Sequence, residues 1–177
     1  TTNLIHGLPV FCVSVALVDG HQPVVAIVYD PNRDECFTAW KGGGTHLNGK
    51  PVRCANRSQL SEALVATGFP HWDFERMDDY LQALTAYARG SRGIRRMGSA
   101  AIDLAYVACG RFDLFFEYSL QPWDIAAGLL LVQEAGGIPC TFSGQDDAEL
   151  MLSGAETFAA APGIAEEGLA VIRSSFG

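Results

Sequence analysis

The sequence comprises 177 residues, of which 49% are hydrophobic, and its 12 basic and 20 acidic residues give a net charge of −8. A chain of this length buries a substantial core and forms one or two globular domains. The negative charge disfavours nucleic acid as a partner, and no uninterrupted apolar run approaches the roughly 20 residues of a membrane span. We therefore expect a cytoplasmic protein that binds neither nucleic acid nor membrane.

The cysteines and histidines do not indicate a zinc centre. The five cysteines are odd in number and widely separated, and the four histidines show no zinc-type spacing to them or to one another. We expect buried free thiols in a reducing compartment.

The first 57 residues alternate short apolar segments with turn signals. Val10–Val18 reads as a strand, followed by strands over Val24–Tyr29 and Glu35–Trp40. Asn48-Gly49 is the favoured pair for a type I′ hairpin. The pattern predicts an antiparallel meander, and the larger side chains of its first strand define the face expected to be packed: Phe11, Val13, Val15 and Leu17.

After Arg57 the pattern changes to short apolar strands separated by helices. The expected strands are Leu64–Thr67, Ile94–Met97, Phe112–Glu117, Ile138–Phe142 and Thr157–Ala161. The expected helices are an amphipathic one bearing Phe74, Met77, Leu81, Leu84 and Ala88, followed by Ala100–Cys109, Asp124–Ala135 and Gly163–Ser175. We predict a layered α/β fold with a sheet-only subdomain over residues 1–57 and an α/β subdomain over residues 58–177.

Asp124 stands at the start of an apolar helix, directly after Pro122 and Trp123. An aspartate there is most simply a helix cap, because its oxygens accept the free amide hydrogens of the first turn. A hard cation also favours a rigidly held carboxylate, and Pro122 and the large Trp123 supply that rigidity. Both roles are compatible, since a carboxylate has two oxygens.

A second junction runs from the strand containing Arg95 through Gly98 and Ser99 into a helix beginning at Ala100. A helix N-terminus presents unpaired amide hydrogens, and a glycine allows a ligand to approach the backbone, so the junction suits an anion or a polyol. The alternative is a tight turn in which Ser99 is only the helix cap. Arg95 is either a substrate clamp or a solvated strand residue.

Glu117 ends a predicted strand shortly before Asp124. Ligands of open α/β sheets bind where strand ends meet helix starts, and an acidic residue there accepts hydrogen bonds from substrate hydroxyls. The alternative is a charged residue at a strand edge that faces water. No motif of a serine hydrolase, P-loop NTPase, Rossmann enzyme or thiol oxidoreductase is present.

Taken together, the motifs resemble those of the inositol monophosphatase family, the magnesium-dependent and lithium-sensitive phosphomonoesterases, and most closely its bacterial-type members. The resemblance rests on the ordered set Val28–Pro31, Gly42–Gly44, Leu47–Gly49, Thr67–Pro70, Gly98–Tyr106, Trp123–Gly128 and Glu134–Gly137. One departure is Thr45, where the family usually has alanine. The resemblance implies an αβαβα sandwich and the hydrolysis of a sugar or inositol monophosphate by water.

The resemblance also implies roles for individual residues. Asp124 would be catalytic, ligate Mg²⁺ and touch the substrate, and Thr1 would orient the attacking water and bind phosphate. The remaining substrate-binding positions would be Arg95, Gly98, Ser99, Ala100 and Glu117. A homodimer with two or three Mg²⁺ ions is expected.

Thr1-Thr2-Asn3 resembles the end of the family's first metal-binding signature, whose aspartates would precede residue 1. We therefore expect the chain to be part of a longer protein and to be inactive alone, because one carboxylate does not hold Mg²⁺. Alternatives to inositol phosphatase activity are nucleotide 3′-phosphatase, fructose bisphosphatase and histidinol phosphatase activity, or a non-catalytic binding or dimerisation module.

Overall fold

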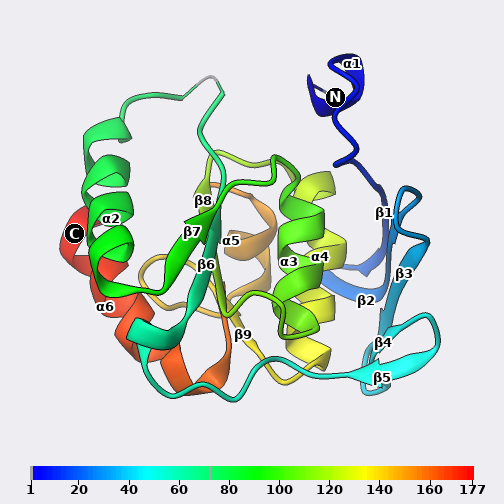
Figure 1. Cartoon of the computed structure of the whole chain (residues 1–177). Coiled ribbons are helices and arrows are strands. Elements are labelled where there is room, and N and C mark those ends of the chain that lie inside the picture. The colour runs from blue at the N-terminus through cyan, green and yellow to red at the C-terminus, as the bar shows by residue number, and fades with distance from the viewer. Residues whose placement is uncertain (1, 72) are drawn as a thin grey trace.

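The computed structural model describes residues 2–71 and 73–177, which form four layers (Figure 1). A helix pair lies between two five-stranded sheets, and a second helix pair covers the outer face of the second sheet. The layered α/β sandwich is thus confirmed. An outermost helical layer against the first sheet, expected for the αβαβα arrangement, is not among the described residues. None of the described helices is long and apolar enough to cross a membrane.

The first sheet is an antiparallel meander, as predicted, with strand order β1-β2-β3-β4-β5. Its strands are β1 (Val13–Asp19), β2 (Gln22–Asp30), β3 (Glu35–Trp40), β4 (Gly44–Leu47) and β5 (Lys50–Val52). The type I′ hairpin is confirmed: Leu47 pairs with Lys50, and both loop residues, Asn48 and Gly49, have positive φ. A short helix, α1 (Thr2–Ile5), precedes this sheet.

The prediction of the packed face of β1 was wrong. Val13, Val15 and Leu17 are 56%, 53% and 61% exposed. The opposite face, which carries the smaller Ala16, packs against the core that contains α4. The larger side chains of β1 therefore point away from the helix layer, and its smaller ones face α4.

The second sheet has the strand order β7-β6-β8-β10-β9, with β6 parallel to β7 and β8, and β10 antiparallel to β8 and β9. Its strands are β6 (Leu64–Thr67), β7 (Gly93–Arg95), β8 (Leu114–Tyr118), β9 (Ile138–Cys140) and β10 (Glu156–Ala160). Short 3-10 turns, Leu60–Glu62 and Pro162–Ile164, precede β6 and follow β10. The central position of β8 places the end of this strand inside the protein.

The remaining helices are α2 (Met77–Gly90), α3 (Ala100–Ala108), α4 (Pro122–Glu134), α5 (Ala148–Leu152) and α6 (Ala165–Phe176). α3 and α4 form the central layer, and α2 and α6 pack together outside the second sheet. α3 and α4 approach closely because Gly128 has no side chain: a Cβ there would lie 2.5 Å from Leu104. Every residue from Ala101 to Ala108 is buried, which explains the almost wholly apolar sequence of α3.

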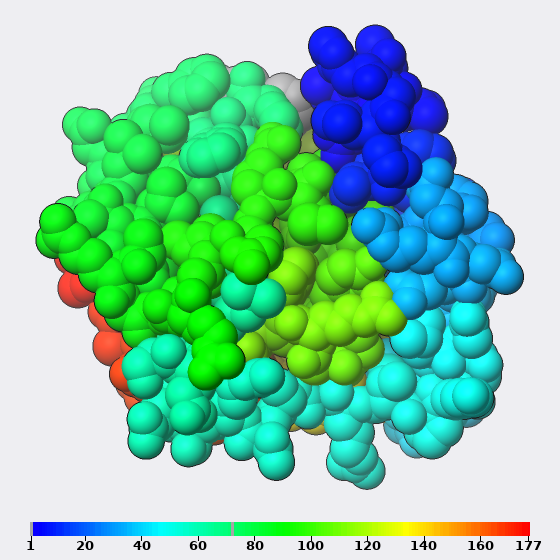
Figure 2. Space-filling view, in the orientation of Figure 1, coloured from blue at the N-terminus to red at the C-terminus, as the bar shows by residue number. Residues whose placement is uncertain are grey.

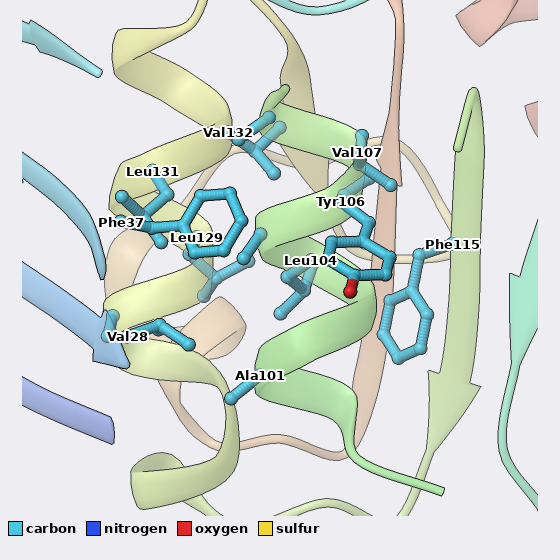
Figure 3. Packing of buried hydrophobic residues seen from close by; sticks show 14 of the residues in the cluster. Val28, Phe37, Ala101, Leu104, Tyr106, Val107, Phe115, Leu129, Leu131 and Val132 are labelled. Atoms are coloured by element: carbon cyan, nitrogen blue, oxygen red, sulfur yellow. The ribbon is translucent and has the colours of Figure 1, made fainter. Parts of the chain in front are cut away.

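The core consists of two clusters on opposite faces of the second sheet. The larger one joins both sheets through α3 and α4, with Phe37 of the first sheet and Phe115 of the second on either side of Leu104 and Tyr106 (Figure 3). This cluster spans both sides of the predicted boundary at residue 57, and the division into two subdomains stays a prediction.

Candidate active site

Three chain segments converge at one end of the central layers: the start of α3, the end of β8 and the start of α4. Glu117 of β8 and Asp124 of α4 interact electrostatically. Cys12, just before β1, lies with its sulfur 3.6 Å from the Ser99 hydroxyl and also interacts with Asp124. The structure therefore brings together three positions that the sequence had indicated separately.

Asp124 is held by the first turn of its own helix. Its Oδ2 accepts the backbone N–H of Gln121 at 3.0 Å, as half of a capping box. The predicted helix start was two residues late, because α4 begins at Pro122 with Gln121 as the N-cap. Asp124 is thus the third helical residue rather than the cap, and no described donor occupies its Oδ1.

The start of α3 has free backbone donors. Gly98 adopts a left-handed conformation with φ of +86°, and Ser99 is the N-cap, but its side chain makes no capping hydrogen bond. The first amide hydrogens of α3, including that of Ala100, are therefore available to an anion or a hydroxyl oxygen. Asn3 fixes the preceding turn by donating to the carbonyl oxygen of Met97 at 3.1 Å.

The segment around Asn3 closes one side of this region. Figure 2 shows the N-terminal residues, in dark blue, lying against the green surface formed by residues near 90–100. Thr1, the predicted catalytic and phosphate-binding residue, lies outside the described residues.

Glu117 is buried in the central strand β8, with 5% of its surface exposed, so its interpretation as a water-facing edge residue is wrong. Burial raises the pKa of Glu117 to about 8, with Arg96 opposing and Asp124 adding to the increase. Gly68 makes room for the carboxyl group, because a Cβ there would lie 2.2 Å from both of its oxygens.

Arg95 and Arg96 differ in their surroundings. Arg95 is exposed, and its Nη1 donates to the Ile94 carbonyl oxygen at 3.0 Å. No described contact joins Arg95 to Glu117 or Asp124, and its role as a substrate clamp stays a prediction. Arg96 interacts electrostatically with Glu117 and lies 5.7 Å from the Phe69 ring centroid, so it is the guanidinium next to the acidic residues.

Sequence reasoning missed two further residues of this region, Arg96 and Asp103. Asp103 is 1% exposed and interacts electrostatically with both Glu117 and Arg96. A signal for Asp103 was present, because it is the single charged residue in the otherwise apolar Ala100–Ala108. Arg96 carries no comparable signal beside Arg95.

The described residues fit magnesium only in part. Asp124 offers a hard carboxylate oxygen fixed by helix geometry, which suits Mg²⁺. Residues 2–71 and 73–177 contain no group of three histidine, cysteine, aspartate or glutamate side chains that could hold a metal ion. Asp124 therefore fits the part of one ligand, and the described residues do not supply the others.

The fold and this region define a class of protein: a layered α/β sandwich with a candidate ligand site where the start of a helix, a buried strand-end glutamate and a helix-borne aspartate meet. The sequence pattern of the inositol monophosphatase family matches residues 1–175. The chain belongs to the inositol monophosphatase family.

Individual relatives agree with this assignment. The inositol-1-monophosphatase of Rhizobium meliloti is 50% identical over 137 residues, covering 77% of this chain and 52% of that protein. The Nus factor SuhB of Xylella fastidiosa is 47% identical over 146 residues, covering 82% of this chain and 53% of that protein. The chain spans about half the length of these curated relatives.

Solved structures show the same fold. The extragenic suppressor protein suhB from Bartonella henselae aligns with a TM-score of 0.91 and 39% identity, covering 98% of this chain and 65% of that chain. The inositol monophosphatase from Anabaena sp. PCC 7120 aligns with a TM-score of 0.90 and 34% identity, covering 98% and 68%.

Proposed function

We propose that the protein containing this chain hydrolyses a sugar or inositol monophosphate to the free polyol and phosphate, with Mg²⁺ as cofactor. The observation that carries the proposal is the convergence of Glu117, Asp124 and the uncapped start of α3 at one end of the central layers. Family membership and relatives named inositol-1-monophosphatase support the same reaction.

Each part of the site has a role suited to its chemistry. The free amides at the start of α3, next to Gly98, bind an oxygen of the substrate. Glu117 accepts a hydrogen bond from a substrate hydroxyl, and its burial keeps bulk solvent away. The Oδ1 atom of Asp124 is the ligand that this chain contributes to a cation.

When bound, Mg²⁺ would activate water and stabilise the negative charge that develops on the departing oxygen. The contribution of Asp124 is positional: its other oxygen, Oδ2, is held by the Gln121 amide. The carboxylate therefore needs little reorganisation when a cation binds.

The substrate class is tested by measuring phosphate release from inositol 1-phosphate, fructose 1,6-bisphosphate, a nucleoside 3′-phosphate and histidinol phosphate during a magnesium titration. The protein expressed from its full reading frame is used. We expect the inositol or sugar monophosphate to be the best substrate. Inositol 1-phosphate being the poorest of the four would overturn the assignment.

Replacing Asp124 by Asn tests its role directly. The amide keeps an oxygen for the Gln121 N–H but lacks the charge that a cation requires, so we expect phosphatase activity to fall at least 100-fold with little change in Tm. Asp147→Asn is the matched control, because Asp147 also accepts an amide hydrogen at a helix start, from Leu150 at 3.0 Å, but caps the separate helix α5. Equal activities of the two variants would contradict the proposal.

A non-catalytic binding module is the second candidate, since the described residues supply only one suitable carboxylate for a cation. Several relatives carry the name Nus factor rather than that of a phosphatase. Absence of phosphate release from all four substrates at saturating magnesium, in a folded protein, would favour this alternative.

A further inference from the structure

Three polar side chains are buried together on the side of the second sheet that faces α3. Phe115 of β8 and Ala159 of β10 belong to the core cluster on this side. Because side chains alternate along a strand, Glu117 and Thr157 point to the same side. Glu117 and Thr157 are directly paired in the sheet register, and Asp103 interacts electrostatically with Glu117 across the layer.

Among the described residues, these polar groups lack hydrogen-bond partners. Both carboxyl oxygens of Asp103 and the hydroxyl oxygen of Thr157 are buried without a partner, and each residue is 1% exposed. No described donor reaches the Glu117 carboxyl either, although it is 5% exposed.

An arrangement of this kind does not stabilise the fold. Burying polar groups without hydrogen bonds is unfavourable, and a carboxyl group at such a position is costlier still. Native proteins satisfy clustered buried polar groups with an internal water, which needs two to four polar partners. The three side chains provide that number of partners, and one of them, Glu117, is the carboxyl that the proposed function assigns to substrate binding.

We propose that Asp103 and Thr157 are positioning residues, which hold the Glu117 carboxyl in its substrate-binding orientation through a hydrogen-bonded network that includes a buried water. Neither residue touches the substrate. This inference rests on the proposed function for its catalytic consequence, but the network itself does not depend on the reaction.

The groups that face this network come from several elements. Arg96, after β7, and Cys12, before β1, both interact electrostatically with Asp103. Arg96 carries the nearby positive charge and interacts with Glu117 as well. Since Arg96 is exposed, it compensates the buried acids only in part, which leaves the network to orient Glu117.

The first test compares activity with stability. Thr157→Val keeps the size of the side chain and removes its hydroxyl, and Asp103→Ala removes the carboxyl within an alanine-rich helix. We expect each variant to lower kcat/KM by about 10-fold, mainly through KM, while Tm stays equal or rises by a few degrees. Asp103→Asn, whose amide can both donate and accept hydrogen bonds within the network, should keep kcat/KM within about threefold of the wild type.

Thr45→Val is the matched control. The Thr45 hydroxyl is buried too, but it donates to the Leu131 carbonyl oxygen at 2.6 Å, far from Glu117 along α4. Its loss should lower Tm and leave kcat/KM unchanged, the opposite pattern to Thr157→Val. Unchanged kcat/KM in both Asp103→Ala and Thr157→Val, or a lowered Tm in both, would assign these residues a purely structural role.

A double-mutant cycle separates positioning from independent effects. In a Glu117→Gln background, Thr157→Val should cause no more than about a twofold further loss, because both changes act on the same substrate contact. Full additivity of the two losses would overturn the proposal.

A crystal structure of the protein tests the network without any activity measurement. We expect ordered water density within hydrogen-bonding distance of the Asp103 carboxyl and the Thr157 hydroxyl. Absence of that density at high resolution would overturn the network even if the protein is a phosphatase. Its presence in a protein without phosphatase activity would instead overturn only the proposed function.

Discussion

Asp124 is placed so that support of the helix start and the proposed cation binding, which the sequence left compatible, would use different carboxylate oxygens. As the third residue of α4, it accepts the Gln121 amide with one oxygen and leaves the other without a described partner. A residue placed at the N-cap itself would turn its carboxylate toward its own helix. The Oδ1 atom is therefore the oxygen that the proposed function assigns to a cation.

The residues of the site could be predicted from the sequence only where a recognisable motif lies at a junction between two predicted elements. Asp124, Gly98 and Glu117 lie at element junctions, and junctions are visible in the pattern of the chain. Asp103 had a signal, as the single charged residue of α3, but its neighbours could not be predicted. For Arg96, a sequence does not specify which of two adjacent arginine side chains lies beside the acidic residues. The same limit applies to Thr157, which a pattern presents only as an ordinary strand residue.

Gly68 permits the position of Glu117, and its replacement gives a residue-scale prediction. In Gly68→Ala, the new Cβ would lie 2.2 Å from the Glu117 oxygens, so the carboxyl must move. We expect kcat/KM for the phosphomonoester to fall by about 10-fold or more, a loss of roughly 1.4 kcal/mol in transition-state stabilisation.

Gly90→Ala provides the control, since a Cβ at Gly90 meets no atom within 4 Å. This variant should retain wild-type kinetics and stability. Wild-type kinetics in Gly68→Ala as well would mean that the orientation of Glu117 is unimportant for turnover.

At the scale of elements, periodicity located most helices and strands to within two or three residues. β3 and β6 have the predicted bounds, Glu35–Trp40 and Leu64–Thr67. The five-residue helix α5 was missed. None of its residues is buried, so it lacks the apolar stripe that periodicity detects.

Glu134, the last residue of α4, connects the central helix layer to the first sheet. Its two carboxylate oxygens accept the backbone N–H groups of Gly42 at 2.8 Å and Gly44 at 2.9 Å. Glu134→Ala should destabilise the protein by about 1 kcal/mol, because charge-assisted hydrogen bonds are strong but this residue is partly exposed to solvent. Thermal unfolding would then show a Tm lower by roughly 2–4 °C.

Hydrogen exchange localises that effect. The amides of Gly42 and Gly44 should exchange faster in Glu134→Ala, while Gln133→Ala, an exposed neighbour on the same helix, should leave them protected. Equal protection in both variants would show that the turn between β3 and β4 is held by other contacts.

For the whole molecule, the alternation of sheet and helix layers followed from the change of period after residue 57. The sequence did not show which face of the first sheet packs against the helices, because both faces of this sheet are rich in apolar residues. Val15 and Ile27, which pair across β1 and β2, are 53% and 38% exposed on its outer face. When apolar residues occupy both faces, alternation cannot tell which face meets α4.

The buried Glu117 makes the stability of the whole protein depend on pH. Its pKa rises from 4.5 to about 8 on folding, so its titration costs the folded state no free energy below pH 4.5, and the protein loses stability as the pH rises from 4.5 through 8. Gln does not titrate, and Glu117→Gln should therefore gain stability relative to the wild type between these limits. We expect a relative increase in Tm on the order of 5 °C, measured by calorimetry across that range.

Glu62→Gln is the comparison, since Glu62 is exposed, and its Tm difference from the wild type should stay constant with pH. A constant difference for Glu117→Gln as well would show that the Glu117 carboxyl is ionised throughout the range.

Because α4 is fixed at both ends, its length cannot vary freely. Asp124 is held in the first turn, Glu134 is bonded to the turn between β3 and β4, and the residues from Ile125 to Val132 are buried. One inserted residue would rotate Asp124 by about 100° about the helix axis relative to Glu134 and move it by about 1.5 Å. We therefore expect an insertion or deletion within α4 to disrupt the site, because the 13 residues of this helix set the position of Asp124 relative to the first sheet.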